Sequence, residues 1–570
     1  MTHRAWFRVL PAAFVLTVVL AVMGAAAAYQ LPPDAPAGFD NETNGFKDQK
    51  TFDADKAAFD ETEEVFQKDA VKNANGCVVK EEVRGGLGPI YNSTSCTACH
   101  QNAGFVERKE MTPGKGKFAN VNPPDSNPKI FFSGNDAVSG TSSQVSEIRA
   151  GHDEVLKDEI FFRDAPGGSV IQQRAIDPSV QERVPVEENI RTLRIATSVL
   201  GDGFVESIPD SAIWDVRKDQ ARLHPDMVGF AVCVPAVIDV KKIENGQPTD
   251  FFFEGRIGRF GWKNQESSLM NFAAGAYVAE MGITSPLQPK ENSFLGRPAP
   301  VAAVDPLQDP EDRAELPRIK FGKDVEAFAR FMRSTKVPPR GAITGDVVEG
   351  EKVFKQIGCN ICHVDTFHTA PEHTQFGDLT VDSHLGGKTI HPYSDFLLHD
   401  VGTGDGIVQT QYAEFPPFPI AEGAVIHDKR LNALLQCKRE DIPNDRLRLQ
   451  NRSKDITALA EVGETPAIQV VLPTGTSLRV GDLSGLAMLS LRDNAPFEMP
   501  LLYTITTANM IRTAPLWGLR TRPQLLHDGR ALTLEDAIDA HHNQGEKSRL
   551  LFKARPDAQK KQLIAFLNSL

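Results

Sequence analysis

The chain has 570 residues, of which 41% are hydrophobic and 24% are charged, as is typical of a globular protein with a sizeable core. A mean hydropathy of −0.28 excludes a polytopic membrane protein. The formal net charge is −13 and no run of Lys and Arg interrupts it, so nucleic acid is not an expected partner, because phosphate binding needs a basic surface. The length is enough for two or more domains.

The N-terminal segment 1–28 has the pattern of a secretory signal. Arg4 and Arg8 precede an apolar run, and a block of alanines at 25–28 follows it. This order predicts cleavage near Ala28 and export to a bacterial periplasm. An uncleaved membrane anchor is the alternative, because the run is nearly long enough to span a bilayer. We therefore expect contact with a membrane only through this segment.

A cysteine pair with a histidine directly after it occurs in the segment STSCTACH. Cys96 and Cys99 are separated by two residues, and His100 follows. C-x-x-C-H is the signature of covalent haem attachment, in which two thiols bind the vinyl groups of the porphyrin and the histidine binds the iron. We expect one haem at this position, with His100 as its proximal iron ligand.

The same pattern recurs in IGCNICHVD, where Cys359 and Cys362 precede His363. A redox dithiol would need a thioredoxin-like context, and a zinc site would need four ligands in paired spacings. Two complete motifs in an exported chain instead indicate two covalently bound haem c groups, with His363 as the second iron ligand. The cysteines outside the motifs are expected to be small buried residues with at most one disulfide among them: Cys77, Cys233 and Cys437.

Two residues between the motifs are candidates for redox chemistry. Trp262, one of four tryptophans, lies in a turn rich in Gly and Arg. An indole between two haems would conduct electrons, although a lone Trp is more often a partly buried surface aromatic. Glu280 could move protons beside an open haem, or it could be an ordinary solvated carboxylate.

We expect a mainly α-helical protein of two cytochrome c-like domains, over 38–335 and 340–570, with long irregular loops and room for a short hairpin. The segment 297–318 is rich in proline and charge, so it is predicted to be a linker or a surface excursion. A helix is expected over 322–335. The segment 403–500 has mixed patterns, and AIQVVLPTG within it is the candidate for the hairpin.

Two further helices are predicted in the C-terminal domain. Val348, Phe354 and Ile357 have the spacing of a short amphipathic helix that ends at the second motif. Such helices resemble the first helix of a cytochrome c domain, which the last helix crosses. The chain ends with an apolar stripe at the matching helical spacing, formed by Leu563, Phe566, Leu567 and Leu570.

Several segments together resemble the di-haem oxidoreductase family, which is similar to bacterial di-haem cytochrome c peroxidases and to di-haem rubber oxygenases. They are GGLGPIYNSTSCTACH, GRFGWKNQ with EMGITSP, IHPYSDFLLHDVG and RTAPLWGLRTRPQLLHDGRALTLEDAI. The resemblance runs from about residue 75 to the end, and 403–500 has no counterpart in it. It implies an enzyme that reduces hydrogen peroxide or a related oxidant, with electrons relayed between two haems.

The resemblance also implies roles for single residues. In the peroxidases, a Met fourteen residues after an HDG segment usually binds the second iron; here that position is His541, with His542 as the alternative. Ligation by two histidines should lower the reduction potential, since Met raises it. Trp262 and Glu280 match a Trp between the haems and a distal Glu, at a slightly shorter spacing, whereas the glutamine of the peroxidases has no clear counterpart. The haem at His100 would be the catalytic one, with an open or labile distal face.

The implied partners are a small electron-donor protein of the cytochrome c or cupredoxin type and a small oxidant substrate. A bound calcium ion is allowed by the resemblance but has no position. Two other functions stay open: an oxygenase of an organic substrate, favoured by a hydrophobic distal pocket, and a non-enzymatic electron carrier, in which both haems would be six-coordinate and inert.

Overall fold

The structure is a computed structural model, and it describes most of the chain. The expected signal segment 1–28, Cys77, Cys437 and the side chain of Cys233 lie outside the described residues. In the part that is described, none of the helices is long and apolar enough to cross a membrane. Besides five short strands between 425 and 490, the described ranges are 32–65, 67–72, 78–84, 86–100, 147–156, 159–307, 309–407, 507–522 and 524–570.

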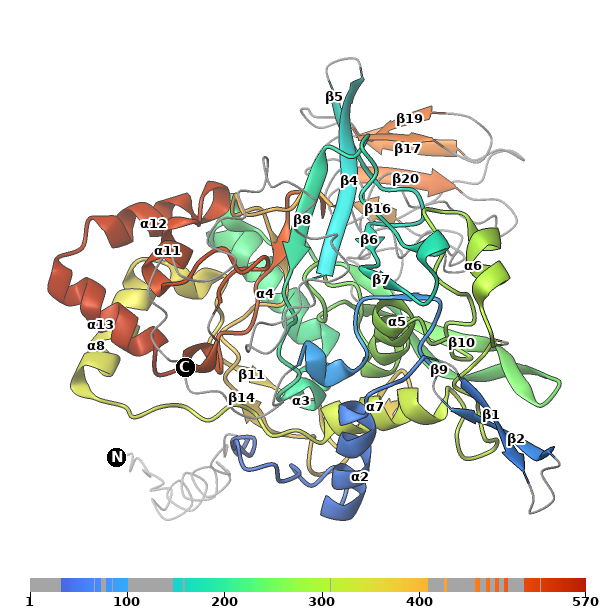
Figure 1. Ribbon diagram of the computed structural model, residues 1–570. Coiled ribbons are helices and arrows are strands. Elements are labelled where there is room, and N and C mark those ends of the chain that lie inside the picture. The colour runs from blue at the N-terminus through green and yellow to red at the C-terminus, as the bar shows by residue number, and fades with distance from the viewer. Residues whose placement is uncertain are drawn as a thin grey trace, which may run out of the picture.

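The expectation of a mainly α-helical protein is wrong. Helices account for only 33% of the structure and strands for 19%, and the strands form many small antiparallel sheets (Figure 1). The helical patterns beside the two motifs do correspond to helices. The error arose because the segments between those helices form β-hairpins and short strand pairs, where loops were expected.

The longest hairpin lies at the right of Figure 1. It pairs β9 (Cys233–Glu244) with β10 (Gln247–Ile257) through the turn residues Asn245 and Gly246. Both turn residues have positive φ, 50° and 80°, as a type I′ turn requires. Asn-Gly is the residue pair that most favours this turn, so the sequence did contain a signal for the hairpin.

A second sheet rises at the top of Figure 1. Its central strand β4 (Glu147–Leu156) pairs with β5 (Glu159–Asp164), β6 (Val170–Ile171) and β8 (Ile190–Arg194). Strands β4 and β8 carry charged side chains into the first of the two cavities described below.

The helices around the first motif are joined by aromatic side chains. Phe59 contacts Phe328 and Phe331 with ring centres 5.9 and 4.9 Å apart. The expected helix over 322–335 is present as α7. The elements concerned are α2 (Gln49–Asp60), η1 (Cys96–Ala98), α3 (Asp202–Glu206), α5 (Leu269–Met281) and α7 (Lys323–Arg333).

At the left of Figure 1, the first and last helices of the C-terminal region cross at a glycine. These are α8 (Gly345–Gln356) and α13 (Asp557–Leu567). A Cβ on Gly350 would lie 1.9 Å from the carbonyl oxygen of Gln562, so only glycine permits this approach. The terminal stripe expected from the sequence is buried here: Leu563, Phe566, Leu567 and Leu570.

One residue of the predicted apolar face of α8 was misplaced. Val348 is 44% exposed, and its neighbour Val347 is buried in its place. The packed face runs through Val347, Phe354 and Ile357, since the crossing at Gly350 sets which side of the helix meets α13.

The predicted linker 297–318 contains a helix. Within it, α6 (Pro298–Val304) begins with a proline in its first turn and buries Val301 against Ile90 and Val180. This segment therefore packs onto the body of the protein through Val301, the one buried residue of α6.

The largest apolar cluster draws on both expected domains. It includes Phe328 and also Phe367 and Phe396, which follow the boundary expected at 335–340. A separate cluster lies between α8 and α13. The division into two domains stays a prediction.

The remaining elements are short. Strand β15 (Leu398–His399) pairs with β21 (Ile511–Arg512) and so joins the two sides of the segment 408–506. The others are β1 (Gln67–Lys72), β2 (Val78–Arg84), β3 (Ile90–Tyr91), β7 (Arg174–Ala175), β11 (Phe367–His368), β12 (Gln375–Phe376), β13 (Leu379–Thr380), β14 (Thr389–Ile390), β16 (Val425–His427), β17 (Thr457–Glu461), β18 (Ile468–Val471), β19 (Ser477–Val480), β20 (Leu486–Ser490), α4 (Asp210–Leu223), α11 (Leu534–Asp539), α12 (Glu546–Lys553) and the 3₁₀ turns η3 (Pro178–Val180), η4 (Pro225–Met227), η5 (Cys359–Ile361), η9 (Leu519–Thr521) and η10 (Asn543–Gly545).

Replacing Gly350 should destabilise the crossing of α8 and α13. We expect Gly350→Ala to lower the free energy of unfolding by about 1–3 kcal/mol, because the added methyl group must push the helices apart. Gly345→Ala, in the first turn of the same helix and with open space around it, is the matched control and should have little effect. Equal stability of the two variants in urea unfolding would contradict this packing.

Candidate haem sites

The first motif forms a tight turn. The Ser95 hydroxyl accepts a hydrogen bond from the Ala98 N–H at 3.2 Å and so caps η1. The N–H groups of Cys99 and His100 donate to the Cys96 carbonyl at 3.1 and 2.9 Å. This turn brings both thiols and the imidazole to the wall of one cavity.

The second motif repeats the turn. The His363 N–H donates to the Cys359 carbonyl at 2.9 Å, as the His100 N–H does to Cys96. Gly358 precedes η5 with φ of 85°, a left-handed conformation that favours glycine. Cys359, Cys362 and His363 line a second cavity.

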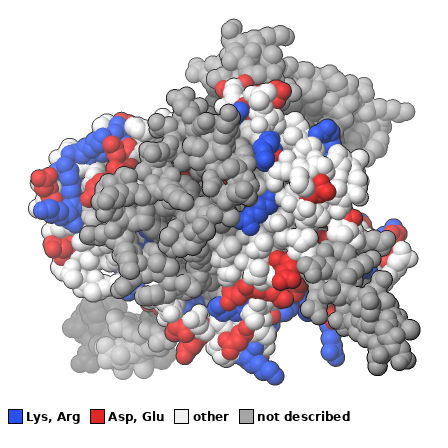
Figure 2. Space-filling model, viewed as in Figure 1, with Lys and Arg blue, Asp and Glu red and all other residues white. Residues whose placement is uncertain are grey.

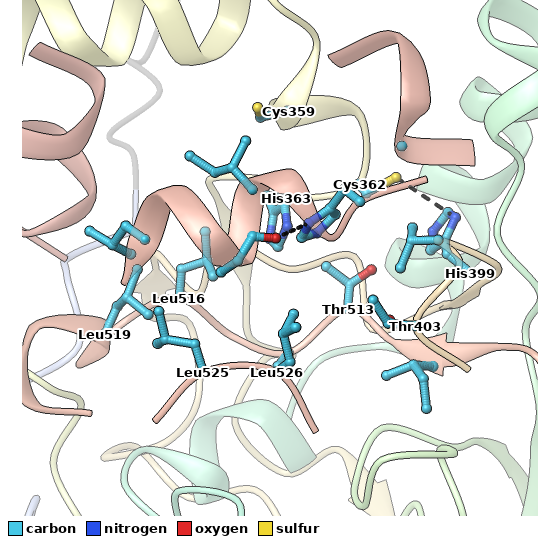
Figure 3. Close-up of a pocket in the computed structure, with 18 of the residues that line it drawn as sticks. Cys359, Cys362, His363, His399, Thr403, Thr513, Leu516, Leu519, Leu525 and Leu526 are labelled. Carbon is cyan, nitrogen blue, oxygen red and sulfur yellow. Dashed lines mark hydrogen bonds between the residues drawn. The ribbon is translucent and has the colours of Figure 1, made fainter. Parts of the chain in front are cut away.

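The wall of the second cavity is largely apolar. Figure 3 shows Leu516, Leu519, Leu525 and Leu526 on one side of it, with Cys359, Cys362 and His363 on the other. An apolar slot with a few convergent polar groups suits a flat porphyrin. The last helices add further aliphatic side chains: Leu534, Ile538, Leu563 and Leu567.

Two imidazoles meet in this second cavity. The ring centres of His363 and His541 are 6.5 Å apart. An iron about 2 Å from one nitrogen of each ring, as in other metal–histidine bonds, would place the ring centres about 6 Å apart. The spacing therefore fits one iron between the two rings.

The free nitrogens of both imidazoles are the ones a metal would use. Nδ1 of His363 is 3.0 Å from the Tyr393 carbonyl, and Nδ1 of His541 is 2.7 Å from the Ala537 carbonyl. A carbonyl oxygen only accepts hydrogen bonds, so each Nδ1 carries the proton and each Nε2 is left free to bind a metal. Burial lowers the pKa of His363 to about 4 and also lowers the pKa of His541, which keeps both rings neutral. The alternative, His542, lies at the surface and pairs with Glu546 at 3.1 Å.

The first cavity has a different lining. His100 is the sole histidine among the described residues that line it, and Phe59 packs beside it with ring centres 5.9 Å apart. Burial lowers the pKa of His100 to about 4, although a hydrogen bond between its ring and the Thr197 backbone acts to raise this pKa. The cavity also contains a group of polar and charged side chains: Glu147, Arg149, Arg194, Gln265, Glu266 and Glu280.

Glu280 is the last residue but one of helix α5 and lines the wall of this first cavity. Its carboxylate accepts a hydrogen bond from the Asn92 side chain at 2.9 Å, and its backbone carbonyl accepts two more from 92–93. Burial, together with the charge of Glu147, raises the pKa of Glu280 to about 8. A carboxyl group that holds its proton at neutral pH can act as a general acid.

Trp262 lines both cavities. Its side chain is 7% exposed, and its indole N–H donates to the Ile195 carbonyl at 2.7 Å. On the side of the second cavity, its ring meets His527 edge to face, with ring centres 6.1 Å apart. The structure therefore places Trp262 between the two motifs, as the proposed relay would require, whereas the relay itself stays a prediction.

Sequence reasoning missed the residues that hold this loop. Lys263, directly after Trp262, lies 3.0 Å from the Asp405 carboxylate, which Arg194 meets at 2.8 Å. Burial lowers the pKa of Lys263 to about 8. Burial also disfavours the charge of Asp405, but the positive charges of Arg194 and Lys263 outweigh this effect and lower the pKa of the Asp405 carboxyl group. Gln265 completes the loop by accepting a hydrogen bond from the Lys263 N–H at 2.9 Å. Lys263 belongs to the segment GRFGWKNQ that was singled out for Trp262, whereas Asp405 and Arg194 lie outside every such segment, so no sequence signal marked these two charges.

A buried histidine beside the second motif was also missed. His399 Nδ1 lies 3.7 Å from the Cys362 sulfur (Figure 3). Its Nε2 lies 2.8 Å from the Asp395 carboxylate. Gln220 donates to the same carboxylate at 2.8 Å. Both His399 and Asp395 belong to the segment IHPYSDFLLHDVG, so the signal was present, and together they fix the position of Cys362.

Both cavities fit a haem on their own chemistry. Arginines that could pair with propionates line each cavity, Arg149 and Arg194 in the first and Arg512, Arg522 and Arg549 in the second. In the second cavity, both ring nitrogens of His527 are buried without a hydrogen-bond partner. Buried polar groups in this state indicate a missing ligand that bears acceptors.

Two cavities that each hold a C-x-x-C-H turn define a protein with two haem sites. The family model described as "Di-haem oxidoreductase, putative peroxidase" matches residues 150–413 and 504–570, which is more than half of the chain. The chain therefore belongs to the di-haem oxidoreductase family and is a haem oxidoreductase. The matched residues include Trp262, Glu280, the second motif and His541, whereas the first motif and 414–503 lie outside them.

Other comparisons add little. No curated protein matches the chain. Among solved structures, it is similar to the hydrazine synthase of Kuenenia stuttgartiensis pressurised with xenon, with 19% identity over 45% of this chain and 58% of that one. The TM-score of 0.19 is too low for a comparison of folds.

Removing the second imidazole should change the coordination of one haem only. We expect His541→Ala to remove the low-spin optical and EPR signals of the second haem, since the opposite face of the iron loses its ligand. The haem content should stay the same by intact mass. His542→Ala is the matched control, because that side chain lies at the surface. An unchanged low-spin signal in His541→Ala would show that another residue binds the iron.

Exchange of the indole should slow electron transfer between the sites. We expect Trp262→Phe to slow transfer by about tenfold, equivalent to a barrier increase of about 1.4 kcal/mol, with both haem spectra intact. Trp214→Phe is the control, because Trp214 is buried in α4 and lines neither cavity. Flash-photolysis or stopped-flow reduction measures the rate, and equal rates in both variants would exclude Trp262 from the path.

Proposed function

We propose that this protein is a periplasmic di-haem c-type oxidoreductase that reduces hydrogen peroxide or a related small oxidant. Electrons would come from a small donor protein and pass between two covalently bound haem c groups. One observation carries the proposal. In the second cavity, the rings of His363 and His541 lie at a spacing that fits one iron, whereas the first cavity is lined by one histidine and by a group of glutamates and arginines. This asymmetry separates an electron-transfer site from a reactive site.

Haem bound in the two cavities would supply the redox chemistry of iron. Cys96, Cys99 and His100 would hold one group, and the second would be held by Cys359, Cys362, His363 and His541. Covalent attachment is supported by the four thiols, which are free and line the cavities. A calcium ion stays an expectation without a position.

The polar side chains of the first cavity suit peroxide reduction. Reduction of one hydrogen peroxide to two waters consumes two protons and two electrons. Glu280 holds a proton at the wall of the cavity, and the charges of Arg149 and Arg194 favour negative charge that develops there. Trp262, which lines both cavities, is the residue best placed to pass electrons between them.

The same lining disfavours the two other functions. An oxygenase of an organic substrate is favoured by a hydrophobic distal pocket, whereas this cavity contains three glutamates and two arginines. A pure electron carrier would need a second strong ligand opposite His100. The described lining of the first cavity offers no other histidine, and its two methionines, Met281 and Met332, are buried in the largest apolar cluster.

Location and partner follow from the sequence. The signal-like segment 1–28 and the haem-attachment motifs support export to the periplasm. The net charge of −13 favours a basic electron donor of the cytochrome c or cupredoxin type. In the view of Figure 2, acidic side chains gather at the lower centre, while Lys and Arg side chains cover much of the left edge.

Loss of the acid at Glu280 should impair the peroxide reaction alone. We expect Glu280→Gln to slow the reaction with hydrogen peroxide by about a hundredfold, within the usual range for a general acid. Reduction of the haems by an external donor should be unchanged, because that step needs no proton from the first cavity. Stopped-flow spectra of the oxidised and reduced enzyme measure both steps. A wild-type enzyme that does not consume peroxide would contradict the proposed function.

A further inference from the structure

We infer that Glu147 and Glu280 form one carboxyl dyad that stores a single proton in the first cavity, with Arg149 keeping Glu147 ionised and Glu280 carrying the proton. Only the use of this proton in peroxide reduction rests on the proposed function. The dyad itself can be detected without turnover.

The geometry brings the two carboxyl groups together from distant parts of the chain. Glu147 begins strand β4 and Glu280 lies near the end of helix α5, and both line the first cavity. The two carboxyl groups lie close enough for each to affect the ionisation of the other. Two ionised carboxylates repel each other and only accept hydrogen bonds, so a pair held this closely is stable with a proton on one of the two groups.

The partners of each group decide which one carries the proton. Arg149 donates to both oxygens of Glu147, from Nε at 2.8 Å and from a terminal nitrogen at 2.5 Å. The other terminal nitrogen of Arg149 donates to Ser169 at 2.7 Å, which holds the guanidinium in place. Among the described residues, the donor to the Glu280 carboxyl group is the neutral Asn92 amide, at 2.9 Å. The negative charge is therefore more stable on Glu147.

The electrostatic surroundings agree with this assignment. Burial and the charge of Glu147 raise the pKa of Glu280 to about 8. Although burial disfavours its charge, Arg149 lowers the pKa of Glu147, and Arg194 on β8 acts in the same direction. Asp164 on β5 in turn stabilises the charge of Arg149.

The dyad predicts how proton supply depends on pH. Below a pH of about 8, Glu280 keeps its proton and can deliver it to an oxidant in the cavity. As the pH rises through about 8, the proton is lost and delivery fails. An isolated glutamate, with an ordinary pKa of about 4.3, would already be ionised at neutral pH.

Two neighbouring substitutions should shift this titration in opposite directions. Glu147→Gln removes the negative neighbour and frees Arg149, so the pKa of Glu280 should fall by about one unit or more. Arg149→Gln removes the positive charge, so the pKa of the dyad should rise. Infrared spectra of the holoenzyme, recorded against pH, detect the C=O stretch of the protonated carboxyl, and its loss in Glu280→Gln assigns the band.

Opposite shifts cannot arise from a general loss of structure. Glu182→Gln is the matched control, because Glu182 is a buried carboxyl with pKa raised by burial to about 7 that lines neither cavity, and it should leave the band unshifted. An identical titration in wild type and Glu147→Gln, or shifts of the same sign in both variants, would overturn the dyad.

Glu266 lines the same cavity and is the alternative candidate for the group that stores the proton. Glu266 is 4% exposed, one of its carboxyl oxygens has no partner, and burial raises its pKa to about 8. If the titrating band disappears in Glu266→Gln and persists in Glu280→Gln, Glu266 is the proton store and the dyad is wrong. If the band behaves as expected but the enzyme does not consume peroxide, the dyad stands and the proposed function fails.

Discussion

The buried charge pair of Lys263 and Asp405 determines how the two cavities are joined. Lys263 also donates to three carbonyls of 507–510, at 2.7, 3.0 and 2.6 Å, so one side chain ties the Trp262 loop to the chain on both sides of the segment 408–506. Arg194 shares the same carboxylate. Removing one partner would leave an unpaired buried charge, at a cost of about 3–5 kcal/mol. Trp262 is thus held between the cavities by electrostatics as well as by packing.

In the proposed function, this arrangement would separate electron movement from proton movement. The indole N–H of Trp262 donates a hydrogen bond to the Ile195 carbonyl. A backbone carbonyl is too weak a base to take up this proton, so the indole would keep its proton while it passes electrons. The acidic side chains that could donate protons line the first cavity instead, at Glu280 and its neighbours. The second cavity, with two neutral imidazoles and an apolar wall, has no comparable carboxyl group among the residues described as lining it. In the proposed function, one chain would thereby combine a reactive site and a relay site.

The sequence predicted local chemistry better than architecture. A C-x-x-C-H motif carries its own geometry, because five consecutive residues form the turn, and the partners His541 and Trp262 stood at positions that a family resemblance marks. Glu147 and Asp405 could not be found this way, since their roles depend on strand pairing and on contacts between residues far apart in the chain. The mainly α-helical expectation failed because the Asn245–Gly246 hairpin and the sheet around β4 lie outside the helical segments that flank the motifs.

The most direct test of the account is the EPR spectrum of the oxidised resting protein. Two unequal sites predict one low-spin signal from an iron between His363 and His541, and one high-spin signal from an iron bound by His100 alone. The two signals should integrate to equal amounts of iron. Two low-spin signals would mean that both sites are closed and that the first cavity is not a reactive site. A single signal would contradict the assignment of two haem sites.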